Sequence, residues 1–534
     1  MDPTPLQAAE PSHGHRLAWL LGSSRVYAKD TAVARRSTFI EALGDHGVPC
    51  DATKLSRWES GRVNVPLAVV RAYEQILGLR TGQLVVAATG FGRGLTRGPV
   101  TVQPPAGDPA AAHLRLDTLF GEAFAGGAAG HTWLELGDLL AHHQHLYLLP
   151  ETWQRICELL ASELSRTTGH GFTCRFETLR MLVANPASRR YAVKAVGAMT
   201  THPAATFLIH PAALLGEVED AQPMELLARV LRMEPSALRA GAAYAVSTKV
   251  VRGHFAESEI GALESLTRRM LKRSSSLIER ADALALAWAL PATGRHLVPP
   301  QGLDRETRTA LENVYRGGEL CDPHTARQVA SRLADTAQEH TPIDYLLGQD
   351  QMLHRLVRES LFHADPARRF RSALLLSASP YRAQLAEPLA AMVTRSDENT
   401  AVLVGAVLFQ LAGAEQRGPL LRAGLRERRE SVRGVALLAS GQVVEQLSAA
   451  ESATLVGSFS TQSTTQATAA GLRVLGMAGA EDCLASVALS HPHLAAAATW
   501  WRENPAVRDR PVGDGPVTAA SATALAAVPD ASHL

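Results

Sequence analysis

The chain has 534 residues, with 53 Lys and Arg against 52 Asp and Glu, and 46% of its residues are hydrophobic. This length predicts at least two structural units rather than one compact domain. The formal net charge of +1 excludes a polycation that binds nucleic acid or anionic lipid over its whole surface, so any such contact must be local. The hydrophobic fraction excludes wholesale disorder, and only 5% aromatic residues in an Ala-, Leu- and Val-rich sequence favour packed helices.

Several classes of protein are not indicated by any pattern in the sequence. No apolar run approaches the roughly 20 residues of a membrane span, and the N-terminus lacks the basic flank and apolar core of a secretory signal. The five cysteines are far apart and form no CxxC pair, so neither disulfides nor a zinc site are expected. No catalytic signature is present. We therefore expect a cytoplasmic protein that is not an enzyme and uses no metal or cofactor.

Composition divides the chain into five segments. Residues 1–13 are rich in Pro and Ala without a period and predict a flexible arm. Residues 14–89 hold several short amphipathic helices and form the first expected domain. Residues 90–110 are rich in Gly and Pro, which predicts a flexible linker. Residues 111–508 predict a large α-helical repeat domain, and residues 509–534 a flexible tail.

The first domain contains the most informative stretch, residues 50–79. Asp51 is a good N-cap, and the helix that it starts would turn Leu55 and Trp58 to one side and small, polar or cationic residues to the other: Ala52, Thr53, Ser56 and Arg57. Such an outer face suits a DNA major groove. Gly61 can adopt the left-handed conformation that ends a helix. The next helix starts at Pro66 and is expected to pack through Val69, Val70 and Tyr73, with Arg71, Glu74 and Gln75 on its outer side.

This stretch is similar to the helix-turn-helix of the XRE family, the phage-repressor-like DNA-binding domains. The family's signature S-x-W-E-x-G-x-x-x-P is matched at every fixed position, namely Ser56, Trp58, Glu59, Gly61 and Pro66. The resemblance covers about a sixth of the chain. It implies a small all-α domain that docks its third helix in the major groove.

The resemblance also implies roles for individual residues. Ala52, Thr53, Lys54 and Ser56 would face base edges, while Arg57, Arg62 and Asn64 would meet phosphates or the groove wall. Trp58 would pack in the core, and Glu59 would brace the turn. The chain departs from the family in the connection between the second and third helices, where residues 44–50 replace a tight turn, and in a long approach to the second helix over residues 26–36.

The charge distribution agrees with a local DNA contact. Residues 14–98 contain 12 basic and 6 acidic side chains, whereas the whole chain carries a formal charge of only +1. Arg93 and Arg97, in the Gly-rich segment, are a second possibility for contact, as an arm along a minor groove. Other arginine-rich runs, such as Arg368-Arg369, are interpreted as solvated helix faces. The histidines near residue 142 are interpreted as a solvated helix end rather than a metal site.

In the second half of the chain, helical segments recur with a period. Segments that begin at Asp365, Asp397, Glu430 and Thr464 start 32, 33 and 34 residues apart, and a shorter one starts at His491. This period resembles that of HEAT-like repeats, in which helix pairs stack into a solenoid. An irregular helical bundle is the alternative.

Two details of the repeats are also predicted. Each segment carries a small residue where a neighbouring helix would approach closely, and these residues are Ala373, Ala406, Ala436 and Ala470. Trp500 and Trp501 are expected to close the exposed end of the last repeat.

The sequence thus predicts an all-α transcriptional regulator, with an N-terminal helix-turn-helix domain followed by a HEAT-like solenoid. It would bind double-stranded DNA as a homodimer, on half-sites about one helical turn or a multiple apart, and would associate with the nucleoid rather than with a membrane. The large C-terminal domain would mediate dimerisation and sense a protein, peptide or small-molecule effector. Three alternatives remain: an interaction scaffold that uses the helix-turn-helix only for localisation, a helix-turn-helix fold that binds protein, and an enzyme hidden in the helical region.

Overall fold

The structure is a computed structural model. It describes residues 11–95, 109–143, 148–202, 209–218, 221–233, 237–274, 277–295, 297, 301–339, 350–459 and 465–509. Over these residues the regular secondary structure is helical, and strand-like pairing is limited to one isolated bridge between Glu319 and His363. The prediction of an all-α protein is confirmed.

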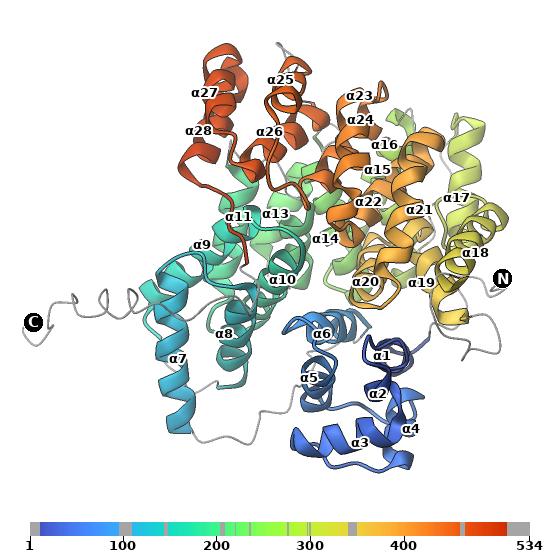
Figure 1. The fold of residues 1–534 in the computed structure, drawn as a ribbon. Coiled ribbons are helices and arrows are strands. Elements are labelled where there is room, and N and C mark those ends of the chain that lie inside the picture. The colour runs from blue at the N-terminus through green and yellow to red at the C-terminus, as the bar shows by residue number, and fades with distance from the viewer. Residues whose placement is uncertain are drawn as a thin grey trace, which may run out of the picture.

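The N-terminal helices form a unit of their own at one end of the molecule (Figure 1). Its members are α1 (His13–Val26), α2 (Thr31–Ala34), α3 (Arg36–Asp45), α4 (Ala52–Glu59), α5 (Leu67–Ile76) and α6 (Gln83–Leu95). Ser12 caps α1 through a hydrogen bond from the His15 backbone N–H. The fold therefore begins inside the segment predicted as a flexible arm, while residues 1–10 of that segment lie outside the described residues.

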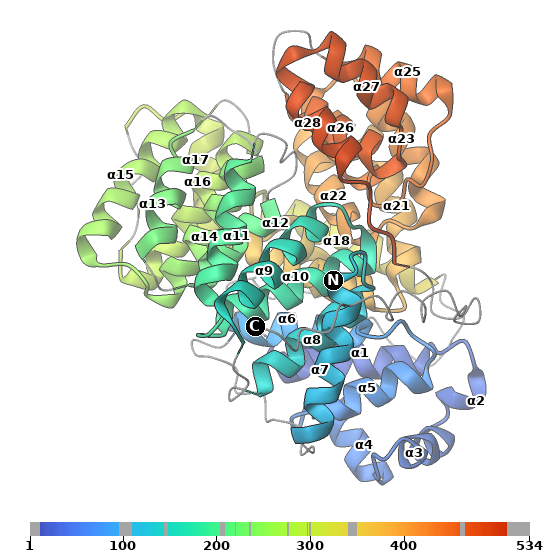
Figure 2. The ribbon, with the colours of Figure 1, turned by 90° about the vertical axis from the view of Figure 1, so that its left-hand side faces the viewer.

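A second group of helices follows and contributes one lobe of the molecule. It comprises α7 (Pro109–Phe124), α8 (Gly130–His142), α9 (Pro150–Ser165), α10 (Gly169–Ala184), α11 (Arg189–Thr201), α12 (Ile209–Ala213), the 3-10 turn η1 (Leu214–Glu217), α13 (Ala221–Val230), α14 (Ala237–Arg252), α15 (Glu257–Arg273), α16 (Leu277–Ala289), η2 (Leu290–Thr293) and α17 (Arg305–Gly317). Figure 2 shows α11 and α13–α17 beside the later helices, with α9 and α10 above the N-terminal unit and α7 running down beside it.

The third group forms the other lobe. It comprises α18 (Pro323–Glu339), α19 (Gln351–Phe362), α20 (Pro366–Ala378), α21 (Arg382–Arg395), α22 (Glu398–Leu411), η3 (Ala414–Gln416), α23 (Arg417–Arg426), α24 (Glu430–Ser440), α25 (Ala449–Gly457), α26 (Gln466–Ala478), α27 (Glu481–Ser490), η4 (Pro492–Leu494) and α28 (Ala495–Glu503). Along this group α20, α22, α24, α26 and α28 pack successively side by side, and α21, α23 and α27 each pair with the helix that follows them.

The predicted starts of these helices agree with the structure to within a residue or two. Asp365 and Asp397 are the N-caps of α20 and α22, and their carboxylates accept backbone hydrogen bonds from Ala367 and Thr400. Glu430 is the first residue of α24. The start at Thr464 is one residue early, because Thr465 provides the cap of α26.

The predicted small contact residues are correct at three positions and wrong at one. Ala373, Ala436 and Ala470 are buried, but Ala406 is exposed. Its neighbour Gly405 makes the close approach, since a methyl group there would lie 2.5 Å from Cγ2 of Val435. The helix is therefore rotated by one residue from the predicted register.

The end of the stack is closed by tryptophan, as predicted for this pair. Trp501 is buried and Trp500 packs edge-on against it, with ring centroids 5.1 Å apart. The Trp501 ring lies directly on Gly476 of α26, where an added methyl group would come within 2.1 Å of it. Because residue 476 is glycine, the large Trp501 side chain can pack directly on α26 and cover the end of the helix stack.

Replacing Gly476 by alanine should therefore destabilise the C-terminal end of the stack by about 1–3 kcal/mol, the usual cost of overpacking a core. The expected readout is a lower thermal unfolding midpoint. Gly121→Ala in α7, where a methyl group meets nothing within 4 Å, is the matched control and should leave the midpoint unchanged or raise it. Equal midpoints for both variants would contradict this account.

The N-terminal unit is seated on the third group and not merely tethered to it. The Arg16 guanidinium of α1 donates to both carboxylate oxygens of Glu359 in α19, at 2.6 and 2.9 Å, and both side chains are fully buried. Trp19 donates its indole N–H to Asp350 at 2.8 Å and stacks on Tyr381. These contacts fix the orientation of the unit on the third group.

The predicted linker also begins too early. Its first residues continue α6 to Leu95, and α6 packs along α20. A methyl group on Gly90 would lie 3.3 Å from Leu374, and the Gly90 carbonyl accepts a hydrogen bond from Arg180 at 2.9 Å. Residues 96–108 lie outside the described residues.

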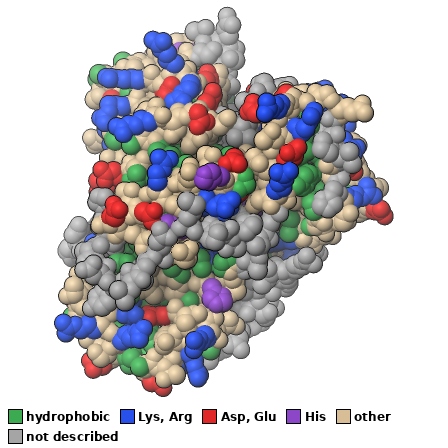
Figure 3. Space-filling view, turned by 90° about the vertical axis from the view of Figure 1, so that its right-hand side faces the viewer, with side chains coloured by type: hydrophobic (Ala, Val, Ile, Leu, Met, Phe, Trp, Pro, Cys, Tyr) green, Lys and Arg blue, Asp and Glu red, His purple; other side chains and the backbone are tan. Residues whose placement is uncertain are grey.

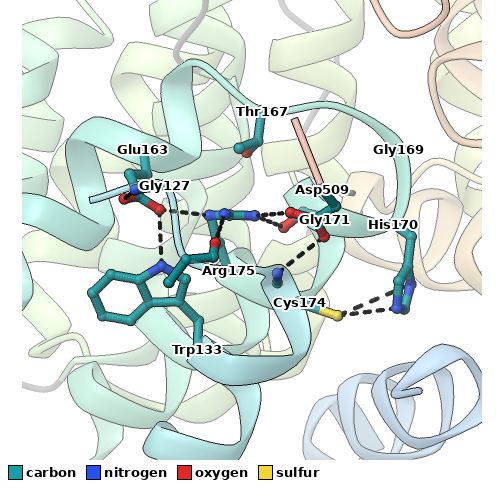
Figure 4. Close-up of polar contacts among 12 residues, drawn as sticks. Gly127, Trp133, Glu163, Thr167, Gly169, His170, Gly171, Cys174, Arg175 and Asp509 are labelled. Atoms are coloured by element: carbon teal, nitrogen blue, oxygen red, sulfur yellow. Dashed lines mark hydrogen bonds and ion pairs between the residues drawn. The ribbon is translucent and has the colours of Figure 1, made fainter. Parts of the chain in front are cut away.

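The first residue of the predicted tail is likewise part of the folded structure. Figure 4 shows Asp509 among buried polar groups of α8–α10. Its carboxylate pairs with Arg175 at 3.0 Å and accepts the backbone N–H of Gly130 at 2.9 Å. Arg175 also pairs with Glu163, which accepts the Trp133 indole N–H. Residue 509 is therefore anchored, and residues 510–534 lie outside the described residues.

The expectation of a solvated helix face is wrong for the pair Arg368-Arg369. Arg368 is buried and bonds the His363 ring at 2.8 Å. Arg369 lines an internal cavity, so this pair is not a solvated helix face. Both side chains belong to the first turn of α20, which lies between the two lobes, and two adjacent charges give no local sign of such burial.

Candidate nucleic-acid interface

Helix α4 has the two faces that its sequence predicts. The Asp51 carboxylate caps it by accepting the Lys54 backbone N–H at 2.7 Å. Leu55 and Trp58 are buried in the core of the N-terminal unit, where they are joined by side chains of α1, α3 and α5 such as Leu21, Phe39 and Tyr73. This packing holds the helix rigidly and leaves its other side to solvent.

All the residues predicted to contact DNA lie on that open side or in the turn after it. Each is exposed: Ala52, Thr53, Lys54, Ser56, Arg57, Arg62 and Asn64. Lys54 is folded back, with its ammonium 5.0 Å from the centre of the Trp58 ring and a hydrogen bond to the Pro49 carbonyl at 3.3 Å. These exposed contacts are weak, so the side chain can reorient toward a ligand at little cost.

Glu59 braces this region, in keeping with the role that the resemblance implies. Its carboxylate accepts two hydrogen bonds from the Arg25 guanidinium, at 2.6 and 2.7 Å, and one from the Tyr73 hydroxyl at 3.0 Å. Burial and the Glu59 charge raise the pKa of Tyr73 well above its ordinary value, so the hydroxyl keeps its proton and its role as donor. The end of α4 is thus tied to both α1 and α5.

The turn after α4 depends on Gly61. This residue has a left-handed backbone with φ of 69°, as predicted, and a Cβ there would lie 3.0 Å from the His15 Cα and 3.1 Å from the Gly14 carbonyl. Both the conformation and the contact with α1 exclude a side chain. The turn then presents Arg62 and Asn64 next to the face of α4.

Replacing Gly61 by alanine should loosen α4 by about 1–3 kcal/mol, because a left-handed residue with a Cβ is strained and the backbone of α1 cannot give way. Hydrogen exchange of the α4 amides reports this as faster opening. Gly44→Ala in α3, where the added methyl meets nothing within 4 Å, is the control. Unchanged exchange in the Gly61 variant would show that the turn relaxes at no cost.

The structure adds basic residues that the motif does not indicate. Lys29, Arg35 and Arg36 are exposed around α2 and the start of α3. Figure 3 shows Lys and Arg side chains spread over the lower end of the molecule, with some acidic ones between them. The excess of basic over acidic residues in this region was the only signal for them, and it does not say which charges are exposed. Arg16 and Arg25, for example, are buried in ion pairs.

The exposed face of α4 lies where a ligand could reach it. In Figures 1 and 2, α3 and α4 lie at the outer end of the N-terminal unit, below α1 and α6. The unit is attached to the third group through α1 and α6, which pack on α19 and α20, and to the second group through α6 on α10 and the Arg71–Asp138 ion pair between α5 and α8. The long connections noted in the sequence also lie at this outer end, since α2 occupies the approach to α3, and residues 46–51 link α3 to α4.

One residue of α5 contradicts its predicted orientation. Glu74 was expected on the outer side but is buried. Its carboxylate accepts the backbone N–H groups of Gly82, Leu84 and Val85 at 2.8, 2.5 and 2.9 Å. Burial raises its pKa above the ordinary value, against the lowering effect of these donors. Glu74 is therefore a cap for the start of α6, which favours a negative charge.

Other predicted features give no further site. No group of three or more His, Cys, Asp and Glu side chains that fits a metal ion occurs in the part of the chain that the structure describes. His143 is buried rather than solvated, and His142 bonds the Asp138 carbonyl. The Arg93 side chain and Arg97, considered as a minor-groove arm, lie outside the described residues.

Comparisons with known proteins do not identify the chain. Neither the models of protein families, nor the curated proteins, nor the solved structures include a match. Among the described helices, none combines the length and the apolar character that crossing a membrane needs. The functional argument therefore rests on the residues and their geometry.

Proposed function

We propose that this protein is a sequence-specific DNA-binding transcriptional regulator of the XRE type. Helices α3 and α4 would form its helix-turn-helix, with α4 in the major groove. The single observation that carries the proposal is the exposure of all seven predicted contact residues on α4 and in the turn after it, at the outer end of the N-terminal unit. Major-groove readers need such a short helix with small and polar residues outward.

The contacts divide by chemistry. Ala52, Thr53, Lys54 and Ser56 would read base edges, while Arg57, Arg62 and Asn64 would hold phosphates. Lys29, Arg35 and Arg36, exposed near the start of α3, would add further phosphate contacts. Because arginine and lysine supply most of these contacts, binding would weaken steeply with salt through counterion release.

The seating of the N-terminal unit on α19 and α20 gives this regulator a specific geometry. One helix-turn-helix reads only a few base pairs, so we propose a homodimer built through the helical region, whose stacked pairs of helices would be HEAT-like repeats. Since α4 cannot swing independently of that region, the two reading helices would keep one separation. Binding should therefore depend sharply on half-site spacing, and a spacer changed by about 5 bp, half a helical turn, should abolish it.

Genome-wide mapping of bound sites tests the proposal. Wild-type protein should give sharp peaks that share a repeated motif, and the Lys54→Ala/Arg57→Ala variant should lose them. Both side chains are exposed, so this variant should remain folded, and its thermal unfolding midpoint provides the check. Diffuse occupancy, or peaks that persist in the variant, would overturn the proposal and favour a scaffold in which this surface does not read DNA.

A further inference from the structure

A large cavity lies between the two lobes, far from the α4 surface. Its volume is about 240 Å³, it is partly open to solvent, and it is lined mainly by residues of α14, α16, α20, α22 and α24. The walls are mostly apolar, and include Ala243, Ala285, Phe370, Val402 and Phe409. A concave apolar site at the junction of two structural units, with a few polar groups, is the usual form of a small-molecule site.

Arg369 is the cation in this cavity. Its Nη1 donates to the backbone carbonyls of His363 and Ala364. Within the described residues, its Nε and Nη2 make no hydrogen bond, and Asp365 and Asp282 act on its charge without forming an ion pair at contact distance. Burial lowers the pKa of Arg369 to about 10, so the guanidinium is charged at neutral pH. It therefore has donors to offer to a bound anion.

The other polar groups of the cavity define what kind of anion fits. Gln410 also lines it, and its Nε2 is buried without a hydrogen-bond partner among the described residues. Asp282 is the acidic residue in the wall, but its carboxylate is already paired with Arg239 at 2.8 Å. The remaining polar residues of the lining carry no charge at neutral pH, and these are Tyr244, Ser360, Asn399 and Gln466. Arg369 is therefore the one cation in the lining, which matches a single negative charge. A dianion would leave its second charge unmatched beside Asp282.

We propose that this cavity binds a small monocarboxylate with an apolar body, whose carboxylate accepts hydrogen bonds from Arg369 while its apolar part fills the space between the lobes. The proposal also gives a partner to the Gln410 Nε2, which is buried without one among the described residues and would otherwise be a cost to the fold. It also accounts for the exposure of Ala406 in the cavity wall, where a larger side chain would fill the space.

Such a ligand would contact the helix that seats the N-terminal unit, and this second step rests on the proposed function. Arg369, Phe370 and Ala373 of α20 face the cavity. On the same helix, Leu374 touches Gly90 of α6, and the Ala378 carbonyl accepts a hydrogen bond from Gln83 of α6 at 3.1 Å. A shift of α20 on binding would thus move the base of the unit that carries α4, which is a physical route for an effector to change DNA affinity.

Titration calorimetry of the full-length protein with octanoate tests the site. We expect saturable binding of one octanoate per chain with a Kd below about 1 mM, and binding at least about 10-fold weaker for octanamide, which has the same shape without the charge. The hexanoate-to-decanoate series covers other lengths. Equal affinity for acid and amide, or no binding across the series, would overturn the proposal.

Three variants assign the binding to Arg369 and the cavity. Arg369→Gln should weaken octanoate binding about 10-fold or more, and Arg369→Lys should retain part of it. Ala406→Phe should block the cavity without disturbing a buried contact, which protects the test against misfolding of the Arg369 variants. Arg422→Gln, at an exposed arginine of α23, is the matched control. Unchanged binding in both Arg369→Gln and Ala406→Phe would place octanoate elsewhere and overturn the assignment.

The coupling to DNA is tested separately. Affinity for a mapped binding site should change by about fivefold or more when octanoate saturates the protein, and Ala406→Phe should abolish this response. Octanoate that binds without altering DNA affinity would overturn the coupling but leave the site. If the protein binds no DNA at all, the proposed function fails, while the calorimetric result on the cavity stands by itself.

Discussion

Replacing Glu359 by glutamine is expected to weaken the attachment of the N-terminal unit by about 3–5 kcal/mol, the cost of removing one partner of a buried ion pair. The Glu359 carboxylate accepts hydrogen bonds from Arg16 at 2.6 and 2.9 Å, from Arg355 at 2.8 Å and from Ser372 at 2.8 Å. Arg16 is fully buried. The substitution removes the carboxylate that pairs with this buried charge.

Hydrogen exchange measures the weaker attachment at the contact between α1 and α19. Amides of α1 and α19 should exchange faster in Glu359→Gln by a factor that corresponds to the lost free energy of opening, while α26–α28 should be unaffected. The control is Glu135→Gln, which removes the exposed ion pair with Arg115 and should cost no more than about 1 kcal/mol. Equal protection of α1 in wild type and Glu359→Gln would mean that the apolar contacts alone hold the unit.

The pH dependence of the same contact has a definite sign. The Arg16 guanidinium and its hydrogen bonds hold the pKa of Glu359 well below its ordinary value of 4.5, against the opposing effect of burial. Its folded-state pKa is therefore depressed, and the stabilisation is present above pH 4.5 and is lost as pH falls toward the folded pKa. Protection of α1 should decrease over that range in wild type. Glu359→Gln lacks the titrating group and should lack this component of the decrease.

The sequence predicts the bounds and faces of α4 well because the signals for them are local. The Asp51 cap, the glycine at position 61 and the spacing of Leu55 and Trp58 can be recognised within a few residues, so capping and periodicity suffice. Glu359 lies 343 positions from Arg16, and no local pattern links them. For the same reason Glu74 was placed outward, since its partners at the start of α6 come together with it only in the folded unit.

Packing also explains why the boundaries of segments were misjudged. Glycine in residues 90–95 resembles a linker by composition, yet Gly90 lies within α6, where an added methyl group would come 3.3 Å from Leu374. The repeat starts were found because caps recur with a fixed period, but periodicity fixes the rotation of a helix only to within a residue, which is the error at Ala406. The charge of Arg369 gave no sign that it lines a cavity, since burial depends on which helices surround α20.

The largest effect on DNA binding is expected from the exposed face of α4. Lys54→Ala/Arg57→Ala should weaken binding to a mapped site by about 100-fold or more, since each good base contact contributes about 1–3 kcal/mol of discrimination and each phosphate contact adds to affinity on all sequences. The loss should come without a change in the thermal unfolding midpoint, because both side chains are exposed. Arg422→Ala, an exposed arginine on the far lobe, should bind as wild type does.

The salt dependence of DNA affinity distinguishes the residues proposed to contact phosphates from those proposed to contact bases. Arg57→Ala and Arg62→Ala should each lower the slope of log affinity against log salt by about 0.9, the value for one lost phosphate contact, and should weaken specific and non-specific sites alike. Lys54→Ala and Ser56→Ala should instead relax the preference at one base pair, because they remove base readout rather than positioning. If all four variants changed slope and specificity together, α4 would be lying along the backbone, and a different element would have to read the sequence.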